Sequence, residues 1–397
     1  MMLNIPRTPM ARRRRRLIAA ALLASVVSGC ASIARVNYTE EDARAALVGN
    51  YGGIRSEAAP LGDRFSDPVR LASRSSAQVN YLIISGGGSG GAFSVGALKA
   101  WSESGKRPSF DVVTGVSTGA LIAPYAFLDP AYDDALVHLY TSGAAKWLVS
   151  AGRFLGDSVL SQEPLRNMIE RYLTEDVRQK IAAEHRKGRR LFVQTTNLDS
   201  QRAVVWDMGA IANSGDAGAL KLLQDVLIAS ASVPGAYPAV LIQAHSRTKA
   251  FNELHSDGAE ASQFLGIPEN VMVSAKGLAR PTPRPINIYA LINNDLEPEF
   301  SVTADNELAV MAEAYAVLVK SQTRSELLAL YLYSRQSGLH FHFASIDRHF
   351  DYTIFDPFNT VYMRSVFDLG HSEMTAGTLW REKPIFPPPG STTSAPG

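Results

Sequence analysis

A serine between two glycines is the clearest candidate for chemistry in this chain. The segment Gly115-Val116-Ser117-Thr118-Gly119 has the Gly-x-Ser-x-Gly pattern of a nucleophile elbow, a sharp turn between a strand and a helix. The glycines are needed there because a side chain two residues to either side would clash with the neighbouring strand or helix. At the start of a helix, free N–H groups and the helix dipole favour developing negative charge. The pattern therefore indicates that Ser117 is either a nucleophile or part of a simple turn.

A glycine-rich stretch earlier in the chain is the second chemical feature. Its consecutive N–H groups, just before an expected helix, could form a nest for an anion. Such a nest could be a phosphate cradle, an oxyanion hole or only a flexible turn. A Walker loop would need Lys and then Ser or Thr after its last glycine, but Ala92 and Phe93 follow here. The stretch consists of Gly86, Gly87, Gly88, Ser89, Gly90 and Gly91.

A dinucleotide-binding turn is a further alternative for this stretch. Gly86, Gly88 and Gly91 have the required glycine spacing. The same motif also needs an acidic residue about 20 residues later, at the end of the next strand. Asp111 instead comes before an expected strand. Glycine spacing leaves the alternative open, and the position of the acidic residue argues against it.

The third feature is an aspartate in the segment His255-Ser256-Asp257-Gly258-Ala259. An Asp-Gly pair is most often a simple turn. A carboxylate can also act as a general base when burial raises its pKa toward neutrality. The catalytic interpretation gains weight because a glycine nest, an elbow and an Asp-Gly-Ala motif occur together in one chain.

The elements that would position these residues alternate between strands and helices. A continuous apolar run at 79–84 leads into the glycine stretch, and another short strand leads into the elbow. This alternation predicts an α/β fold with a mainly parallel sheet. The segment 305–332 reads as one helix packed on the surface of the body through Leu308, Met311, Ala312, Tyr315 and Leu318. The expected strands are 79–84, 110–113, 190–197 and 285–291, and the other expected helices are 92–101, 120–128, 163–172 and 220–230.

The three motifs, in this order, resemble the signatures of patatin-like phospholipases. The segment 227–238 looks like that family's helix and proline-containing loop ahead of the aspartate, and 161–173 is similar to its segment of Pro-Leu and an amphipathic helix. The resemblance covers roughly residues 77–372. It implies a patatin-like three-layer fold, with a mainly parallel central sheet flanked by helices. One residue departs from the pattern, since Gly90 stands where the family usually has Arg or Lys.

The resemblance also implies a mechanism of acyl-ester hydrolysis. Asp257 would accept the proton of Ser117, which attacks the ester carbonyl, and no histidine would take part. The Gly87 and Gly88 N–H groups would stabilise the oxyanion. The implied substrate is a lipid or another acyl ester, as for a phospholipase A, a lysophospholipase or a lipid esterase. Neither a metal nor a cofactor is required.

Two other functions stay open at this point. An ordinary Ser-His-Asp triad would use a histidine as base, and the chain order permits it. Alternatively, a non-catalytic lipoprotein could use the same scaffold for lipid binding or envelope assembly, which Gly90 would favour. A strained serine turn with a matched aspartate argues against a non-catalytic protein. His340 and His342 could in principle bind zinc, but their spacing is more typical of two residues on one face of a strand. The candidate bases of a triad are His255, His340, His342 and His371.

The N-terminus has the layout of a lipoprotein signal. Five arginines at 12–16 precede a short apolar run at 17–27, which is too short to span a bilayer as a stable helix. Val27-Ser28-Gly29-Cys30 resembles a lipobox, in which Cys30 would be lipidated and become the new N-terminus. The alternatives are an ordinary signal peptide or an uncleaved anchor. Cys30 is the single cysteine of the chain, which excludes an intrachain disulfide.

Charge and segment order complete the expectations from sequence. After removal of 1–29, 33 basic and 38 acidic residues remain, a net charge of −5, which argues against a nucleic-acid partner. No protein partner can be inferred. Ala31-Ser32 lacks the Asp that can retain lipoproteins at the inner membrane, so the outer membrane is favoured. We expect a signal peptide at 1–29, a spacer at 30–76, a hydrolase domain at 77–372 and a proline-rich tail at 373–397.

Overall fold

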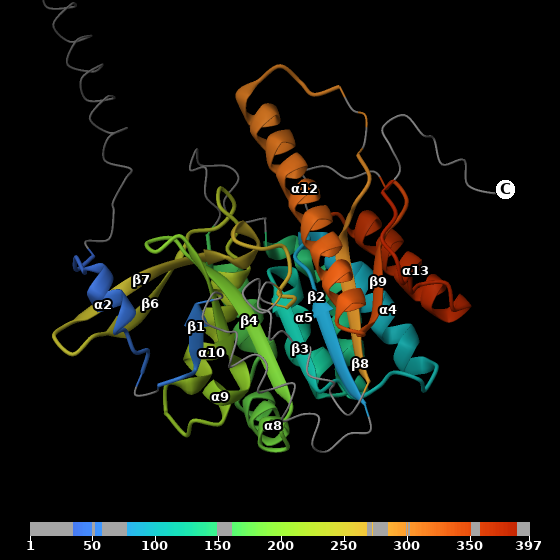
Figure 1. Cartoon of the computed structure of the whole chain (residues 1–397). Coiled ribbons are helices and arrows are strands. Elements are labelled where there is room, and N and C mark those ends of the chain that lie inside the picture. Colours follow the sequence, from blue (N-terminus) through green and yellow to red (C-terminus); the bar gives the residue numbers. More distant parts are fainter. Residues whose placement is uncertain are drawn as a thin grey trace, which may run out of the picture.

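The computed structural model of the chain describes residues 35–49, 52–57, 78–148, 161–267, 272, 285–298, 300, 302–350 and 358–386. Within these residues, nine strands form one mixed sheet with helices on both faces (Figure 1). The strands are β1 Arg55–Glu57, β2 Val79–Ile84, β3 Val112–Val116, β4 Arg190–Asn197, β5 Arg202–Asp207, β6 Val240–His245, β7 Ala250–Asp257, β8 Ile286–Asp295 and β9 His340–Ile346. The described α-helices are α2 Glu40–Arg44, α4 Gly91–Glu103, α5 Thr118–Leu128, α6 Asp133–Thr141, α7 Glu163–Tyr172, α8 Glu175–Arg186, α9 Met208–Ala212, α10 Ala219–Ser230, α12 Glu307–Gln336 and α13 Thr360–Ala376.

The centre of the sheet is parallel, as the sequence predicts. The strand order is β1-β5-β4-β3-β2-β8-β9, and the five strands from β4 to β9 in this order run parallel. An antiparallel arm was not predicted from the sequence. In it, β5 and then β1 extend the sheet beyond β4, while the β6–β7 hairpin pairs with the C-terminal end of β4. This last pairing brings a late segment of the chain beside the strands that precede the elbow.

The central strands are buried on both faces, which explains their continuous apolar runs. In β2, Leu82 and Ile84 join one apolar cluster, which includes side chains of α4, α5, α10 and α13. Tyr81 and Ile83 point into a second cluster, which includes the C-terminal half of α12. The result is the three-layer arrangement that the family resemblance implies.

Part of the segment expected to be a spacer is folded onto the body, which corrects that expectation. Strand β1 pairs with β5, and Leu47 forms a β-bridge with His245. The sequence of 35–57 is polar and short of apolar periodicity, so its pairing with an edge strand left little pattern to detect. Residues 1–34 and 58–77, with Cys30 and the expected signal peptide, lie outside the described residues.

The expected boundary at residue 373 is also wrong. Helix α13 continues to Ala376 and ends at Gly377, whose φ of 76° is the left-handed conformation favoured at helix ends. Beyond it, Arg381 forms a β-bridge with Phe343 of β9. The folded body therefore continues at least through Arg381, and residues 387–397 lie outside the described part.

Helix α12 has the expected position but not the expected packing. Met311 and Leu318, predicted to face the body, are 69% and 66% exposed. The residues that do pack lie in the second half of the helix and include Leu327, Leu330, Tyr331 and Tyr333. Helical spacing identifies an apolar face but not its partner, and here the first half extends beyond the strands (Figure 1). Among the described helices, none is both long and apolar enough to cross a membrane.

Candidate active site

Ser117 occupies a strained turn between β3 and α5. Its φ of 54° and ψ of −122° are unusual for a residue with a side chain and cost of order 1–3 kcal/mol. The turn passes so close to its neighbours that a Cβ on Gly119 would lie 2.2 Å from the Ile84 carbonyl oxygen. A Cβ on Gly115 would lie 2.3 Å from the carbonyl oxygen of Gly119. The two glycines of the pentapeptide are therefore required by the close approach of backbone.

The Ser117 hydroxyl donates a hydrogen bond to Asp257. The distance from Oγ to Oδ2 is 2.6 Å, and the aspartate side chain is fully buried. The other carboxylate oxygen accepts a hydrogen bond from the Ala259 N–H at 2.8 Å. The Ser117 N–H is held by Ser230 Oγ at 3.1 Å. Both partners of the pair are thus fixed in position, one by the elbow and the other by the Asp-Gly-Ala turn.

Asp257 reaches Ser117 through the antiparallel pairing of β7 with β4. In this register Asp257 lies opposite Thr195, and Thr196 Oγ1 donates to the Asp257 carbonyl oxygen at 2.8 Å. The Asp257 N–H donates to the Ser232 carbonyl oxygen at 3.1 Å, in the loop after α10. The backbone of the aspartate is therefore fixed on both sides. The proline-containing loop that marks the resemblance has a structural task at the site.

Burial raises the pKa of Asp257 to about 7. The hydrogen bonds from Ser117 and from the Ala259 N–H favour the carboxylate and oppose this effect, while the charge of Glu260 adds to it. A base whose pKa lies near the working pH is well suited to accept a proton from a hydroxyl group. The arrangement can therefore activate Ser117 without a histidine.

The glycine loop lies directly against this pair. A Cβ on Gly86 would be 3.3 Å from Ser117 Cβ and 3.4 Å from Ala259 Cβ. Gly87 and Gly88 have φ values of 142° and 54°. Within the described residues, the N–H groups of these two glycines make no hydrogen bond. They can therefore donate to an oxyanion formed at Ser117.

Three of the predicted oxyanion-loop residues have another task, which corrects their assignment as donors. The Gly86 N–H donates to the Gln263 carbonyl oxygen, and the Gly90 N–H donates to that of Gly87. The Gly91 N–H is directed at the carbonyl oxygens of Gly88 and Ser89. The bonds of Gly90 and Gly91 form the first turns of the following helix, and the bond of Gly86 ties the loop to Gln263, so all three shape the loop. The sequence could not distinguish donors that are used within the loop from those left for a ligand.

Asn293 supports the loop from the end of β8, and the sequence analysis missed it. Its side chain is 1% exposed; Nδ2 donates to the Ser85 carbonyl oxygen at 2.8 Å, and Oδ1 accepts from Ser94 Oγ at 2.5 Å. A Cβ on Gly90 would lie 2.1 Å from the Asn293 carbonyl oxygen. The close approach of β8 therefore explains why glycine stands at position 90, which is a basic residue in the pattern that the chain resembles. A polar residue directly after the run 288–292 was the available signal.

Gly90→Ala should distort the loop and lower activity. The added Cβ would collide with backbone, for which overpacking costs of about 1–3 kcal/mol are typical, and loss of loop donors lowers turnover by about 100-fold or more. Chemical unfolding and p-nitrophenyl ester hydrolysis measure the two effects. Gly52→Ala is the matched control, because a Cβ there would meet no atom within 4 Å. If Gly90→Ala is as stable and active as Gly52→Ala, the role given to Asn293 is wrong.

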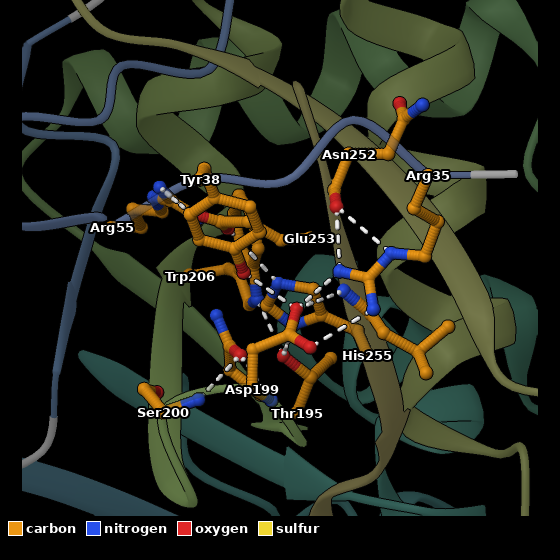
Figure 2. A network of polar contacts seen from close by, with 12 residues as sticks. Arg35, Tyr38, Arg55, Thr195, Asp199, Ser200, Trp206, Asn252, Glu253 and His255 are labelled. Carbon is orange, nitrogen blue, oxygen red and sulfur yellow. Dashed lines mark hydrogen bonds and ion pairs between the residues drawn. The ribbon is translucent and has the colours of Figure 1, made fainter. Parts of the chain in front are cut away.

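His255, two residues before Asp257, lies in a network of polar side chains (Figure 2). His255 is fully buried, with Nδ1 2.9 Å from Thr195 Oγ1 and Nε2 3.2 Å from Glu253 Oε2. Trp206 Nε1 donates to the same threonine at 2.8 Å, and Arg55 forms an ion pair with Glu253. Burial lowers the pKa of His255, and Glu253 acts in the opposite direction. Both ring nitrogens are thus occupied by groups other than Ser117.

The remaining histidines lie away from the pair. His340 and His342 pair with Asn287 and Tyr289 of β8, toward the end of the strand opposite Asn293. His371 Nε2 is 2.8 Å from Glu103 Oε2, in a contact between α13 and α4. Within the described residues, none of these histidines hydrogen-bonds to Ser117. The same part of the chain contains no group of three or more His, Cys, Asp or Glu side chains that could hold a metal ion.

The fold and the site define an α/β protein with a buried serine–carboxylate pair beneath a glycine loop. Residues 82–265, which include all three motifs, match the family model described as patatin-like phospholipase. This segment, a little under half of the chain, is therefore similar to a patatin-like phospholipase domain.

Comparison with solved structures gives weak similarities. VipD from Legionella pneumophila aligns at a TM-score of 0.30 and 10% identity, over 74% of this chain and 67% of its own. Human GIVD cytosolic phospholipase A2 aligns at a TM-score of 0.32 and 10% identity, over 79% of this chain and 56% of its own. The chain thus spans little more than half of the human enzyme. Similarity at this level does not bear on the activity, and no curated protein matches the sequence.

Proposed function

We propose that this protein is a serine acyl-ester hydrolase that acts on lipids, with Ser117 as nucleophile and Asp257 as base. The observation that carries the proposal is the 2.6 Å hydrogen bond from Ser117 Oγ to a buried carboxylate, at a strained turn below a loop with free N–H groups. A hydroxyl group held in this way is ready to lose its proton as it attacks.

The reaction would proceed in two stages. Ser117 Oγ attacks the ester carbonyl carbon while Asp257 Oδ2 takes its proton, and the Gly87 and Gly88 N–H groups stabilise the oxyanion. The tetrahedral intermediate collapses, and Asp257 returns the proton to the leaving alcohol. Water then attacks the acyl-enzyme, with Asp257 again acting as base. The fatty acid leaves and Ser117 regains its proton.

An apolar pocket lies among α5, α6, α7 and α10, and the helices that line it also lead to the site. Its lining includes Leu121, one turn after Ser117 on α5, and Leu227, one turn before Ser230 on α10. The other lining residues are Tyr125, Ala135, Leu136, Leu139, Met168, Ile169, Tyr172 and Leu173. The pocket's free volume of about 20 Å³ holds roughly one water molecule, so an acyl chain on Ser117 would enter it only if the lining side chains moved apart. Phospholipase A, lysophospholipase and lipid esterase activities all fit this chemistry.

The competing scaffold function loses its main support. That alternative relied on Gly90, which the close approach of Asn293 explains on structural grounds. The discriminating experiment is hydrolysis of short- and long-chain p-nitrophenyl esters, with phosphatidylcholine in parallel, by the purified full chain. We expect ester hydrolysis with a preference among chain lengths. A chain that binds lipid but is inert toward every ester would instead be a scaffold.

We also propose that Cys30 carries the lipid anchor and that the protein is held at the outer membrane. The lipobox-like Val27-Ser28-Gly29-Cys30 and the following Ala31-Ser32 support this. In a bacterial host, the chain should incorporate labelled palmitate and fractionate with outer membranes. Cys30→Ser should abolish the labelling. Labelling that persists in Cys30→Ser would show that another residue carries the acyl group.

A further inference from the structure

The first half of α12 is a helix that is apolar around its circumference and yet exposed. Between 309 and 319, Glu313 is the single charged residue. A helix of a folded protein normally has a polar face toward water, and one that is apolar all round is normally buried. Phe300 and Val302, just before the helix, are 93% and 88% exposed. We call the following residues the apolar tip: Phe300, Val302, Val310, Met311, Tyr315, Val317 and Leu318.

The second half of the same helix braces the catalytic loops. Gln322 Nε2 donates to the Ala261 carbonyl oxygen at 3.2 Å, just after the Asp-Gly-Ala turn. Glu326 Oε2 accepts from the Gln263 N–H at 3.0 Å, and the Gln263 carbonyl oxygen in turn accepts from Gly86 of the glycine loop. One rigid helix therefore joins the apolar tip to both loops around Ser117.

The tip begins a few turns before the residues of α12 that brace the catalytic loops. The pKa of Tyr315 is raised, first by partial burial and then by the negative charges of Asp257 and Glu260. Tyr315 is seven residues before Gln322, or about two helical turns. The exposed apolar surface thus starts on the helix that braces the catalytic loops, within about two helical turns of Gln322, and continues outward along the projecting part of α12 (Figure 1).

We propose that the apolar tip of α12 docks into a lipid surface and so presents that surface to Ser117. This inference rests on the proposed function, because a lipid substrate in a membrane must meet the protein beside the active site. The tip projects as a single helix, a shape suited to insertion among lipids, whereas a second copy of the chain would need a broader complementary face.

The length of the chain before the described residues agrees with a membrane nearby. Cys30 is five residues before Arg35, where the description begins. Five residues reach about 18 Å when fully extended. A lipid-anchored Cys30 would therefore keep Arg35, and the body to which it is bonded through Asp199, close to the bilayer. The tip would be a second, non-covalent contact with the same surface.

An environment-sensitive fluorophore at the tip tests docking directly. Leu318→Cys and Leu332→Cys place the label on exposed positions of the same helix, one in the tip and one in the braced half. The unmodified full chain, whose sole cysteine is Cys30, gives the background. In phosphatidylcholine vesicles, the label at 318 should shift to the blue and be quenched by nitroxide-bearing lipids, and the label at 332 should do neither.

Two pairs of substitutions that add negative charge test the consequence for catalysis. Met311→Glu with Leu318→Glu should lower the ratio of vesicle to soluble-ester hydrolysis about tenfold or more, because charge opposes insertion among lipids. Leu328→Glu with Leu332→Glu adds the same charge to the braced half and should leave the ratio unchanged. Equal effects of the two pairs on the ratio would overturn the proposal.

The fluorescence result also separates this proposal from the proposed function. If the chain hydrolyses no ester but the label at 318 enters the lipid, the function fails and docking stands. If hydrolysis occurs while the labels at 318 and 332 behave alike, docking fails and the function stands. The label at 318 could also shift to the blue in the absence of vesicles, while light scattering shows that the chain is a dimer. That result would assign the tip to a second copy and overturn the proposal.

Discussion

Ser117→Ala should lower kcat/KM for acyl esters by at least about 10,000-fold, because the nucleophile of a covalent mechanism has no substitute. The fold should persist. Alanine keeps the Cβ and the backbone N–H that is bonded to Ser230, and it loses only the hydroxyl group. Steady-state hydrolysis of a soluble p-nitrophenyl ester measures the loss, and circular dichroism shows that the variant is folded.

The matched control for this prediction is the neighbouring histidine. His255→Gln keeps a polar side chain within the network of Thr195 and Glu253, so the folded variant should retain kcat/KM within about tenfold. A Ser-His-Asp triad predicts the opposite, since loss of its base is as damaging as loss of its serine. A folded His255→Gln variant that is as inactive as Ser117→Ala would therefore refute the dyad.

Asp257→Asn should remove activity and at the same time stabilise the protein at alkaline pH. The general base contributes about 100- to 10,000-fold to the rate. The carboxylate is also costly to bury, since its pKa rises from the ordinary value of 3.8 to about 7. A shift of this size corresponds to as much as about 4 kcal/mol of lost stability once the group is ionised. Asparagine keeps the shape and removes the charge.

The pH dependence of this effect has a definite sign. Below pH about 4, Asp257 is protonated in both the folded and the unfolded chain, and its burial costs nothing. Between pH about 4 and 7 only the unfolded chain ionises, so stability falls as pH rises, and above pH 7 the cost is constant. The stability gain of Asp257→Asn should thus grow from pH 4 to 7.

Two measurements follow from this titration. The melting temperature of Asp257→Asn minus that of the unmodified chain should be near zero at pH 4 and positive at pH 8. The kcat/KM of the unmodified chain should rise with pH and level off above pH about 7, when the base is ionised. If this difference in melting temperature is smaller at pH 8 than at pH 4, the ionised Asp257 does not destabilise the folded chain.

The sequence predicted the local elements well because their signals are local. The apolar run of β2, the glycine loop and the elbow are adjacent in the chain, and β3 leads directly into Ser117 as expected. The position of Asp257 beside the elbow could not be predicted from local signals. Asp257 reaches the elbow through the β7–β4 register, a long-range pairing that leaves no periodic signal, so the sequence could assign it to Ser117 only through the family resemblance.

The features that the sequence analysis missed depend on tertiary contacts. Asn293 supports the glycine loop only because β8 lies beside β2, and no local pattern marks a carbonyl oxygen that another loop approaches. The packing of α12 was predicted wrongly for a related reason. Its apolar face at Met311 and Leu318 looks like a core face, and the absence of a partner in the fold cannot be read from the helix alone.

The most direct test of the central claim is reaction of the full chain with a fluorophosphonate, followed by mass spectrometry of the peptides. An activated serine forms a stable phosphonyl ester with such a reagent. We expect a single adduct on Ser117, formed rapidly at pH 8 and far more slowly in Asp257→Asn. An unreacted Ser117, an adduct on another serine, or equal reaction of Asp257→Asn would contradict a nucleophile that Asp257 activates.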